Sequence, residues 1–294
     1  MTAIVDATFG MGSTHIVCQD YARISTNPAN VYGIVADGCS KSPDTDTGAR
    51  LLTLAAEQYF QTFPEADVDM RYITGQAFQA ARMFKMHAQS VDATLLCIRV
   101  QEECGFLRAR ATVVGDGYVV ARHRQSQHLL VYEISFPSGY PFYGSYLLQK
   151  GRFESLLTEG EYGLTRLVKE STIAPDGTWK ECPTPVVREN GKSTSISVSW
   201  DFSSETFDLV SVFTDGAGSF FDISNNRREH VPHQKILHEL SAYKRFIGQF
   251  VQRRFSRFLK DAEKRGWVHD DDISVATVYM ESALAEEVKV NGNA

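Results

Sequence analysis

Aspartate-glycine pairs at the ends of short apolar runs constrain the fold more than any other feature of this sequence. Three pairs directly follow such runs, in VYGIVADG, RATVVGDG and LVSVFTDG, and the acidic stretch HDDD precedes a fourth run, ISVATV. Short apolar runs bounded by turn residues predict buried strands. Strands held in a rigid sheet can bring aspartates that are distant in sequence to one place. A cluster of carboxylates is therefore one interpretation of the pattern.

The alternative is that each pair forms an independent turn, because Asp-Gly is favoured in β-hairpins. We accept the turn for Asp176 in APDGTW. For Asp116 the turn is a strong rival, since ATVVGDGYVVAR has the pattern of a hairpin. It is weaker for Asp37 and Asp215, which are followed by polar or small residues instead of an alternating return strand.

Apolar periodicity predicts the class of fold. Helical spacing predicts helices over 47–63, 69–90 and 233–265. Strands are predicted over 31–36, 93–100, 106–114, 118–123, 128–134, 207–213 and 273–280. The four strands between 93 and 134 look like a meander. This order predicts an α+β fold in which helices are layered on mostly antiparallel sheets.

The 294-residue chain contains no fixed-period repeat and no low-complexity linker. We predict one domain over residues 1–284 and a loose tail over 285–294. Residues 136–200 are the least regular part and hold five prolines. We expect loops there, with one helix near 152–170.

Composition excludes several classes of protein. Hydrophobic residues make up 43% and charged residues 22% of the chain, which is typical of globular proteins. The net charge of −6 argues against nucleic-acid binding. No membrane-length apolar run or secretory signal is visible, so we expect a cytoplasmic protein with no membrane partner. The five cysteines are scattered without a CxxC pair, as in a reducing compartment. The sequence leaves the oligomeric state open.

A carboxylate cluster would favour a hard divalent cation. Several carboxylates held together repel one another, and a bound cation relieves that repulsion. Oxygen ligands without a paired His or Cys favour Mg²⁺ or Mn²⁺ over Zn²⁺. A glycine next to an aspartate, as in the Asp-Gly pairs, lets the backbone carbonyl approach the ion.

Six segments resemble, in the same order, the motifs of the metal-dependent type-2C (PPM family) serine/threonine protein phosphatases, especially the bacterial members. They are STHIVCQDYA (13–22), VADGCSKSPDTDTGA (35–49), VDATLLCIRV (91–100), VVGDGYVVAR (113–122), VFTDGAG (212–218) and DDDISVATV (270–278). The resemblance implies a four-layer αββα sandwich, in which two antiparallel β-sheets are flanked by helices.

The resemblance also implies a centre of two Mn²⁺ or Mg²⁺ ions, with a third, weaker ion in many members. Asp37 would bridge the two ions, and the carbonyl of Gly38 would complete one site. Asp215 and Asp271 would bind the other ion, and Asp116 would help to hold the third.

The register within DDDIS follows from the family pattern Asp-(Asn or Asp)-x-(Ser or Thr). It makes Asp271 the ligand and Asp272 its neighbour, and leaves Asp270 outside the site.

The implied reaction is hydrolysis of phosphoserine and phosphothreonine by a water or hydroxide that bridges the two ions. No covalent intermediate is needed. The substrate would be a phosphorylated protein, with a partner Ser/Thr kinase as its expected source. Residues 136–200 lie where the family often carries a flap, and are the candidate for substrate selection.

The first motif departs from the family pattern, which often reads Arg-x-x-x-Glu-Asp. Asp20 is kept, where the family uses it near the metal-bound waters, but Gln19 stands at the glutamate and His15 at the phosphate-binding arginine. Histidine is only partly charged near neutrality and forms no bidentate fork, so His15 would capture phosphate weakly or pH-dependently, or is a polar surface residue. Cys39, at a position where some members place a proposed histidine acid, is expected to have no acid role.

Asp37, Asp20 and His15 are the expected catalytic residues. The altered first motif keeps a second hypothesis open, a regulatory binding module that has lost catalysis. A phosphatase that acts on a small phosphorylated molecule is a third.

Residues 244–265 carry eight Lys or Arg residues against Asp261 and Glu263. The simpler interpretation is a solvated helix face. The alternative is a docking surface for an acidic or phosphorylated partner.

Overall fold

The computed structural model describes residues 2–158, 165–182, 186–189, 196–225 and 227–281. The predicted tail at 285–294 and part of the 136–200 excursion lie outside the described residues. None of the helices in the described ranges is long and apolar enough to span a membrane.

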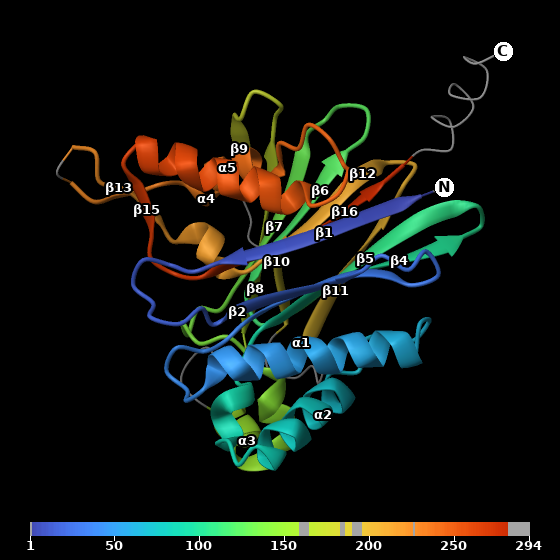
Figure 1. The fold of residues 1–294 in the computed structure, drawn as a ribbon, viewed down its shortest axis with the longest axis vertical. Coiled ribbons are helices and arrows are strands. Elements are labelled where there is room, and N and C mark those ends of the chain that lie inside the picture. Colours follow the sequence, from blue (N-terminus) through green and yellow to red (C-terminus); the bar gives the residue numbers. More distant parts are fainter. Residues whose placement is uncertain (1, 159–164, 183–185, 190–195, 226, 282–294) are drawn as a thin grey trace.

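Two antiparallel sheets occupy the centre of the molecule (Figure 1). The larger sheet contains, in spatial order, β1 (Ala3–Gly10), β16 (Ile273–Met280), β12 (Phe207–Phe213), β6 (Gly117–His123), β7 (Leu129–Ser135), β8 (Arg166–Ile173) and β10 (Val186–Glu189), with β9 (Trp179–Glu181) paired to β8. The smaller sheet contains β11 (Ser197–Ser203), β5 (Phe106–Val114), β4 (Leu95–Glu103), β3 (Val31–Asp37) and β2 (Asp20–Ser25). A third, short sheet is formed by β14 (Glu229–His230), β13 (Phe220–Asp222) and β15 (Trp267–His269).

Helices cover the outer faces of both large sheets. In Figure 1, α1 (Thr45–Thr62) and α2 (Met70–Met83) lie below the smaller sheet with α3 (Lys150–Thr158) beside them. On the opposite side, α4 (His233–Ser241) and α5 (Phe250–Lys264) lie against the larger sheet. Three 3₁₀ turns complete the structure: η1 (Ala88–Val91), η2 (Gly144–Leu148) and η3 (Asp215–Gly218). The predicted four-layer αββα sandwich is confirmed.

The β3 strand shows why the sandwich forms. Its run VYGIVA is apolar at nearly every position because both faces of the strand are buried. Val35 packs in the core between the two sheets, whereas Ile34 packs against helix residues such as Leu52 and Ile73. Each fully buried side chain of this size contributes roughly 1.5–3 kcal/mol to folding.

Three of the predicted helices are longer than the helices of the structure. The helix predicted over 69–90 stops at Met83, and Lys85 then adopts a left-handed conformation with φ of 57°. The segment 233–265 forms two helices instead of one, because the chain between them turns through Gly248 at φ of 55° and Phe246 stacks on Tyr279. The helix predicted near 152–170 is wrong from residue 166 onward.

Residues 166–170 belong to β8, which pairs with β7 along its length. The predicted meander is also wrong at its centre, because β5 and β6 do not pair with each other. The β5 strand pairs with β4 and β11, and β6 pairs with β7 and β12. The chain therefore crosses from one sheet to the other between β5 and β6, which decides where Asp116 lies.

Candidate functional site

The aspartates singled out in the sequence lie at the ends of strands from both sheets. Asp37 is the last residue of β3, and Asp20, the first residue of β2, pairs directly opposite it. Asp215 begins η3 just after β12. Asp271 lies two residues before β16, and Asp116 lies in the crossing between β5 and β6. The sandwich thus brings residues as far apart in the sequence as Asp20 and Asp271 to one end of the sheets.

The hairpin alternative for Asp116 is wrong, because its flanking strands belong to different sheets. Gly115 and Gly117 adopt φ of 93° and 132°, conformations that L side chains rarely reach. A Cβ on Gly117 would also lie 2.5 Å from the backbone oxygen of Phe213. The Gly-Asp-Gly sequence therefore makes a sharp crossing that holds Asp116 near the end of β12.

The turn interpretation of Asp176 is confirmed. Its Oδ1 accepts a hydrogen bond from the backbone N–H of Thr178 at 2.9 Å, and Gly177 adopts φ of 87°. The residue lies in the β8–β9 turn, away from the other aspartates.

The carboxylates at the strand ends raise one another's pKa values. Burial raises the pKa of Asp37 well above its ordinary value, and the charges of Asp20, Asp215, Asp271 and Asp116 raise it further. Asp215 is shifted in the same direction, by burial first and then by the charges of Asp116 and Asp271. The pKa of Asp116 is raised to about 6, mainly by burial and then by the charge of Asp271. Ionised carboxylates are thus destabilised here by their surroundings.

Several of these aspartates have an oxygen without a hydrogen-bond partner, or lack an arginine or lysine partner, among the described residues. One carboxylate oxygen of each of Asp20, Asp116 and Asp215 is buried without a hydrogen-bond partner. Within the described ranges, no Lys or Arg side chain forms an ion pair with Asp20, Asp37 or Asp215. A buried acceptor without a partner costs about 1–3 kcal/mol, and more if charged.

A cavity of about 330 Å³ opens beside Asp116 and Asp215. Asp116, Asp215 and Asp271 line it together with Tyr118 and Glu133. Among the described His, Cys, Asp and Glu residues, no three side chains converge tightly enough to enclose an ion. The carboxylates therefore face a shared, solvent-connected space and affect each other's pKa without closing on one point.

Asp271 and Asp272 have different surroundings. Asp272 is buried: its Oδ1 accepts the N–H of Gly12 at 2.7 Å, and its Oδ2 accepts the N–H of Gln19 at 2.5 Å. Asp271 has a side chain that is 42% exposed and lines the cavity. Asp272 thus ties the β1–β2 loop to the start of β16, while Asp271 is free to meet a ligand.

Asp270 points away from this group and forms an ion pair with Arg228. Its backbone oxygen accepts hydrogen bonds from the N–H and hydroxyl of Thr14, which also hold the β1–β2 loop.

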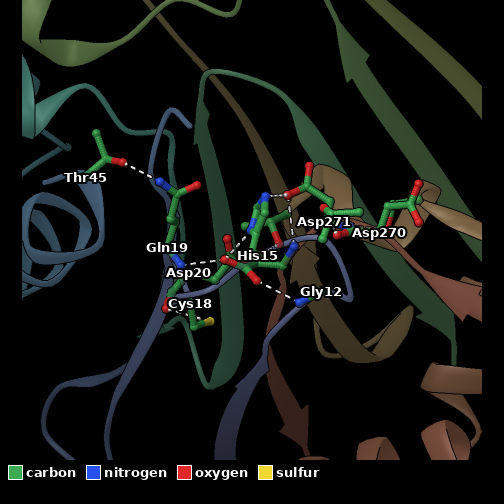
Figure 2. A network of polar contacts seen from close by, with 12 residues as sticks. Gly12, His15, Cys18, Gln19, Asp20, Thr45, Asp270 and Asp271 are labelled. Carbon is green, nitrogen blue, oxygen red and sulfur yellow. Dashed lines mark hydrogen bonds and ion pairs between the residues drawn. The ribbon is translucent and has the colours of Figure 1, made fainter. Parts of the chain in front are cut away.

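His15 reaches from the β1–β2 loop toward Asp271 (Figure 2). It also lies close to Asp272. Its Nδ1 lies 2.9 Å from Asp272 Oδ2, poorly aligned for a hydrogen bond, and its Nε2 lies 3.5 Å from Asp271 Oδ1. Burial alone would lower the pKa of His15, but the neighbouring Asp272, Asp271 and Asp20 carboxylates give a net rise. His15 is therefore directed at the acidic group and is not a simple surface residue.

Two tyrosines at the site were not identified in the sequence. Burial raises the pKa of Tyr143, and the nearby Cys39, Asp37 and Asp116 add to the shift. Tyr118 lines the cavity and is shifted in the same direction by burial and then by Glu133. Tyr143 follows a proline-rich stretch that carries no motif, so no sequence signal could have found it.

Asp92 belongs to the motif VDATLLCIRV, and the motif by itself predicts no role for it. Its buried carboxylate accepts hydrogen bonds from Arg152 in α3 at 2.8 and 3.0 Å, and from Ser145 and Ser42 at 2.5 and 2.9 Å. Its backbone oxygen accepts the N–H of Cys39 at 2.9 Å. Asp92 thus connects the start of the excursion to the loop that follows Asp37.

Comparison with known proteins agrees with the motif analysis. Residues 12–135 match the family Protein phosphatase 2C. Similar solved structures include the serine/threonine phosphatase Stp1 from Staphylococcus aureus, at 13% identity over 96% of each chain with a TM-score of 0.51. Others are PppA, a key regulatory component of T6SS in Pseudomonas aeruginosa (12% identity, 96% and 99% coverage, TM-score 0.50), and a bacterial serine phosphatase (11%, 95% and 98%, 0.50).

No curated protein sequence matches the chain. The resemblance to bacterial type-2C phosphatases is confirmed by the family match in the first half of the chain and by the shared fold over almost all of it.

Proposed function

We propose that this protein is a metal-dependent phosphatase that hydrolyses phosphoserine and phosphothreonine in proteins. Two observations carry the proposal. Asp116, Asp215 and Asp271 line one cavity and act electrostatically on Asp37, and all four have raised pKa values. Among the described residues, no Lys or Arg side chain forms an ion pair with Asp37 or Asp215. A site built in this way is stabilised by cations from solution. Its all-oxygen donors suit Mn²⁺ or Mg²⁺.

The unpartnered oxygens fit this assignment. Two of them belong to Asp215 and Asp116, which both line the cavity. Asp215 would hold two ions together with Asp37, Asp271 and the carbonyl of Gly38, and Asp116 would contribute to a third. Gly38 packs so closely that a Cβ would lie 2.5 Å from the backbone oxygen of Thr45, which keeps that peptide in place. When bound, the ions would supply a water of lowered pKa and positive charge for the phosphoryl oxygens.

Asp20 is proposed to orient water and to exchange a proton at Oδ1. Its Oδ2 accepts a hydrogen bond from Thr214 Oγ1 at 2.7 Å, and Thr214 Oγ1 in turn accepts one from the Ser274 N–H at 2.8 Å. Asp20 Oδ2 is thus held by Thr214, which is itself held by Ser274 of β16. Asp20 Oδ1 has no hydrogen-bond partner. Burial is the main reason that the pKa of Asp20 is raised to about 7, which suits proton exchange near neutrality.

His15 is proposed to assist phosphate binding in place of an arginine. Its ring faces Asp271 and Asp272, so the acids hold it at the edge of the site. An imidazolium offers single hydrogen bonds where a guanidinium offers a fork, and we expect weaker phosphate capture.

The test is hydrolysis of p-nitrophenyl phosphate and of a phosphothreonine peptide with Mn²⁺, with chelator, and in Asp37→Asn and Asp215→Asn variants. We expect turnover that needs the metal and falls at least about a thousandfold in both variants, because each removes a metal-binding charge. Calorimetric Mn²⁺ binding supplies a readout that is independent of turnover. Turnover that survives chelation would contradict the mechanism.

A regulatory binding module is the second candidate, favoured by one observation. Gln19 stands at the position where the motif often has a glutamate. Its side-chain amide donates a hydrogen bond to Thr45 Oγ1 at 3.0 Å and carries no charge. A protein of this kind would bind Mn²⁺ and a phosphopeptide without turnover, and Gln19→Glu would then be expected to restore activity. Faster turnover of small phosphorylated molecules than of phosphopeptides would instead indicate a metabolite phosphatase.

A further inference from the structure

A second feature of the molecule, a basic groove at the start of α5, is not used by the proposed reaction. A cavity of about 280 Å³ lies there between the α4–α5 connection and α5 itself. Its walls are formed mainly by five cationic side chains: Lys244, Arg245, Arg253, Arg254 and Arg257. Residues 242–260 contain no Asp or Glu, although the whole chain has a net charge of −6.

Acids elsewhere in the fold do little to neutralise this groove. Glu239 and Asp261 are the carboxylates that act on Arg254. Glu239 is already paired with Arg265 at 2.6 Å, and Asp261 lies 3.4 Å from Lys264. Within the described ranges, Lys244, Arg245 and Arg257 form no ion pair.

Asp6, a buried acid that acts on Arg253, also has other partners. Asp6 accepts hydrogen bonds from the backbone N–H groups of Val251 and Gln252 at 2.7 and 3.3 Å, and so caps the first turn of α5. Asp6 attracts Arg253, but Arg253 donates a hydrogen bond to the backbone oxygen of Ile247 at 2.7 Å. The remaining positive charge is therefore available to an external anion.

The shape of the groove favours an extended protein segment over a flat surface. Its floor is formed by the buried rings of Tyr243 and Phe250, and its rim includes several arginines on successive turns of one helix. Ile247, next to the groove in the chain, is 64% exposed and offers an apolar contact as well. Arginine guanidinium groups in such an arrangement match carboxylates with paired hydrogen bonds.

We propose that this groove is a docking site for an acidic segment of a partner protein. The site is separate from the carboxylate cavity, because Asp271 follows the far end of α5. The 15 residues of α5 span about 22 Å at 1.5 Å per residue. The occupant would therefore bind without covering the reaction site, and this proposal stands whether or not the protein is an active phosphatase.

The experiment measures fluorescence anisotropy of a fluorescein-labelled hexaglutamate peptide with the full chain. Chelator is present, so that metal ions in the carboxylate site cannot hold the peptide. The variants are Arg245→Glu and Arg257→Glu, two exposed positions whose side chains form no ion pair among the described residues. The matched control is Arg82→Glu, an equal charge change on an exposed residue of α2.

We expect the peptide to bind with an affinity that falls as salt rises, because exposed charges are screened. Each groove variant should weaken binding by about tenfold and Arg82→Glu by less than about twofold, since interfacial charge effects act at short range. Circular dichroism and the melting temperature of each variant report whether it remains folded.

Three results would overturn the proposal. Equal losses in Arg82→Glu and the groove variants would show attraction by net charge alone. Equal binding of a hexaglutamine peptide would show that acidity is irrelevant. Binding to vesicles of anionic lipid without binding to the peptide would identify a membrane surface instead of a protein partner.

Discussion

Asp92 and Asp37 both lie beside the loop that follows β3, but among the described residues only the carboxylate of Asp92 has a cationic partner. Asp92 is 1% exposed, and Arg152, Ser145 and Ser42 satisfy its carboxylate. Asp37 and Asp215 have no such cation in the described ranges, and their pKa values are raised well above the ordinary value.

The comparison separates a structural charge from a functional one. The fold can neutralise a buried carboxylate, and does so at Asp92, where the pair joins α3 to the loop after β3. Leaving Asp215 unneutralised costs stability. Such a cost is typical of sites whose missing charge comes from a ligand.

The largest stability effect is expected when Asp92 is replaced by Ala. The change leaves Arg152 without its buried partner and should lower the free energy of unfolding by about 3–5 kcal/mol. Urea unfolding followed by circular dichroism measures it. The double variant Asp92→Leu with Arg152→Met should recover most of the loss, because it removes both charges. A loss below about 1 kcal/mol in Asp92→Ala would contradict the structural role.

Metal addition should stabilise the protein through the aspartates at the strand ends and not through Asp92. Mn²⁺ at about 100 times its dissociation constant should stabilise the wild-type chain by about 2.7 kcal/mol, because it binds the folded state alone. Thermal unfolding with and without chelator tests this. Asp215→Asn should abolish the stabilisation, whereas Arg152→Met should retain it. The same metal shift in Asp215→Asn would place the ion elsewhere.

In the absence of metal, Asp215→Asn should stabilise the protein by about 1–3 kcal/mol, since it removes a buried charge that lacks a partner. This sign is the opposite of that expected at Asp92. Chelator-treated samples in a urea titration provide the measurement, with Asp176→Asn, on an exposed turn, as the control of equal charge change. Destabilisation of Asp215→Asn, or no difference between it and Asp176→Asn, would contradict the expected sign.

The smallest effect concerns pH. The folded pKa of Asp116 is about 6, above its ordinary value of 3.8, so the folded state binds the proton more tightly than the unfolded state. This contribution to stability is fully present below pH 4 and is lost as the pH rises toward 6. Without metal, the stability of wild type relative to Asp116→Asn should therefore fall over this range. Urea midpoints between pH 4 and 7 would show it, and a constant difference would contradict the raised pKa.

Much of the architecture could be predicted from local pattern. Each of the seven predicted strands is present, including β3 and β12, because alternation and β-branched residues report burial directly. The remaining strands, such as β1 and β2, were not predicted. Helix ends and the 136–200 excursion were less predictable. The run after α3 becomes β8 because β7 offers an open edge, and periodicity carries no information about such a partner.

The sequence by itself determined which residues could form a cation site, because Asp37, Asp116, Asp215 and Asp271 stand next to predicted strands. It could not decide between a hairpin and a crossing at Asp116. The pairing of β5 and β6 with different sheets made that decision, since strand pairing depends on long-range contacts. The tertiary structure also determined which acids are neutralised, because the partner of Asp92 lies 60 residues away, at Arg152.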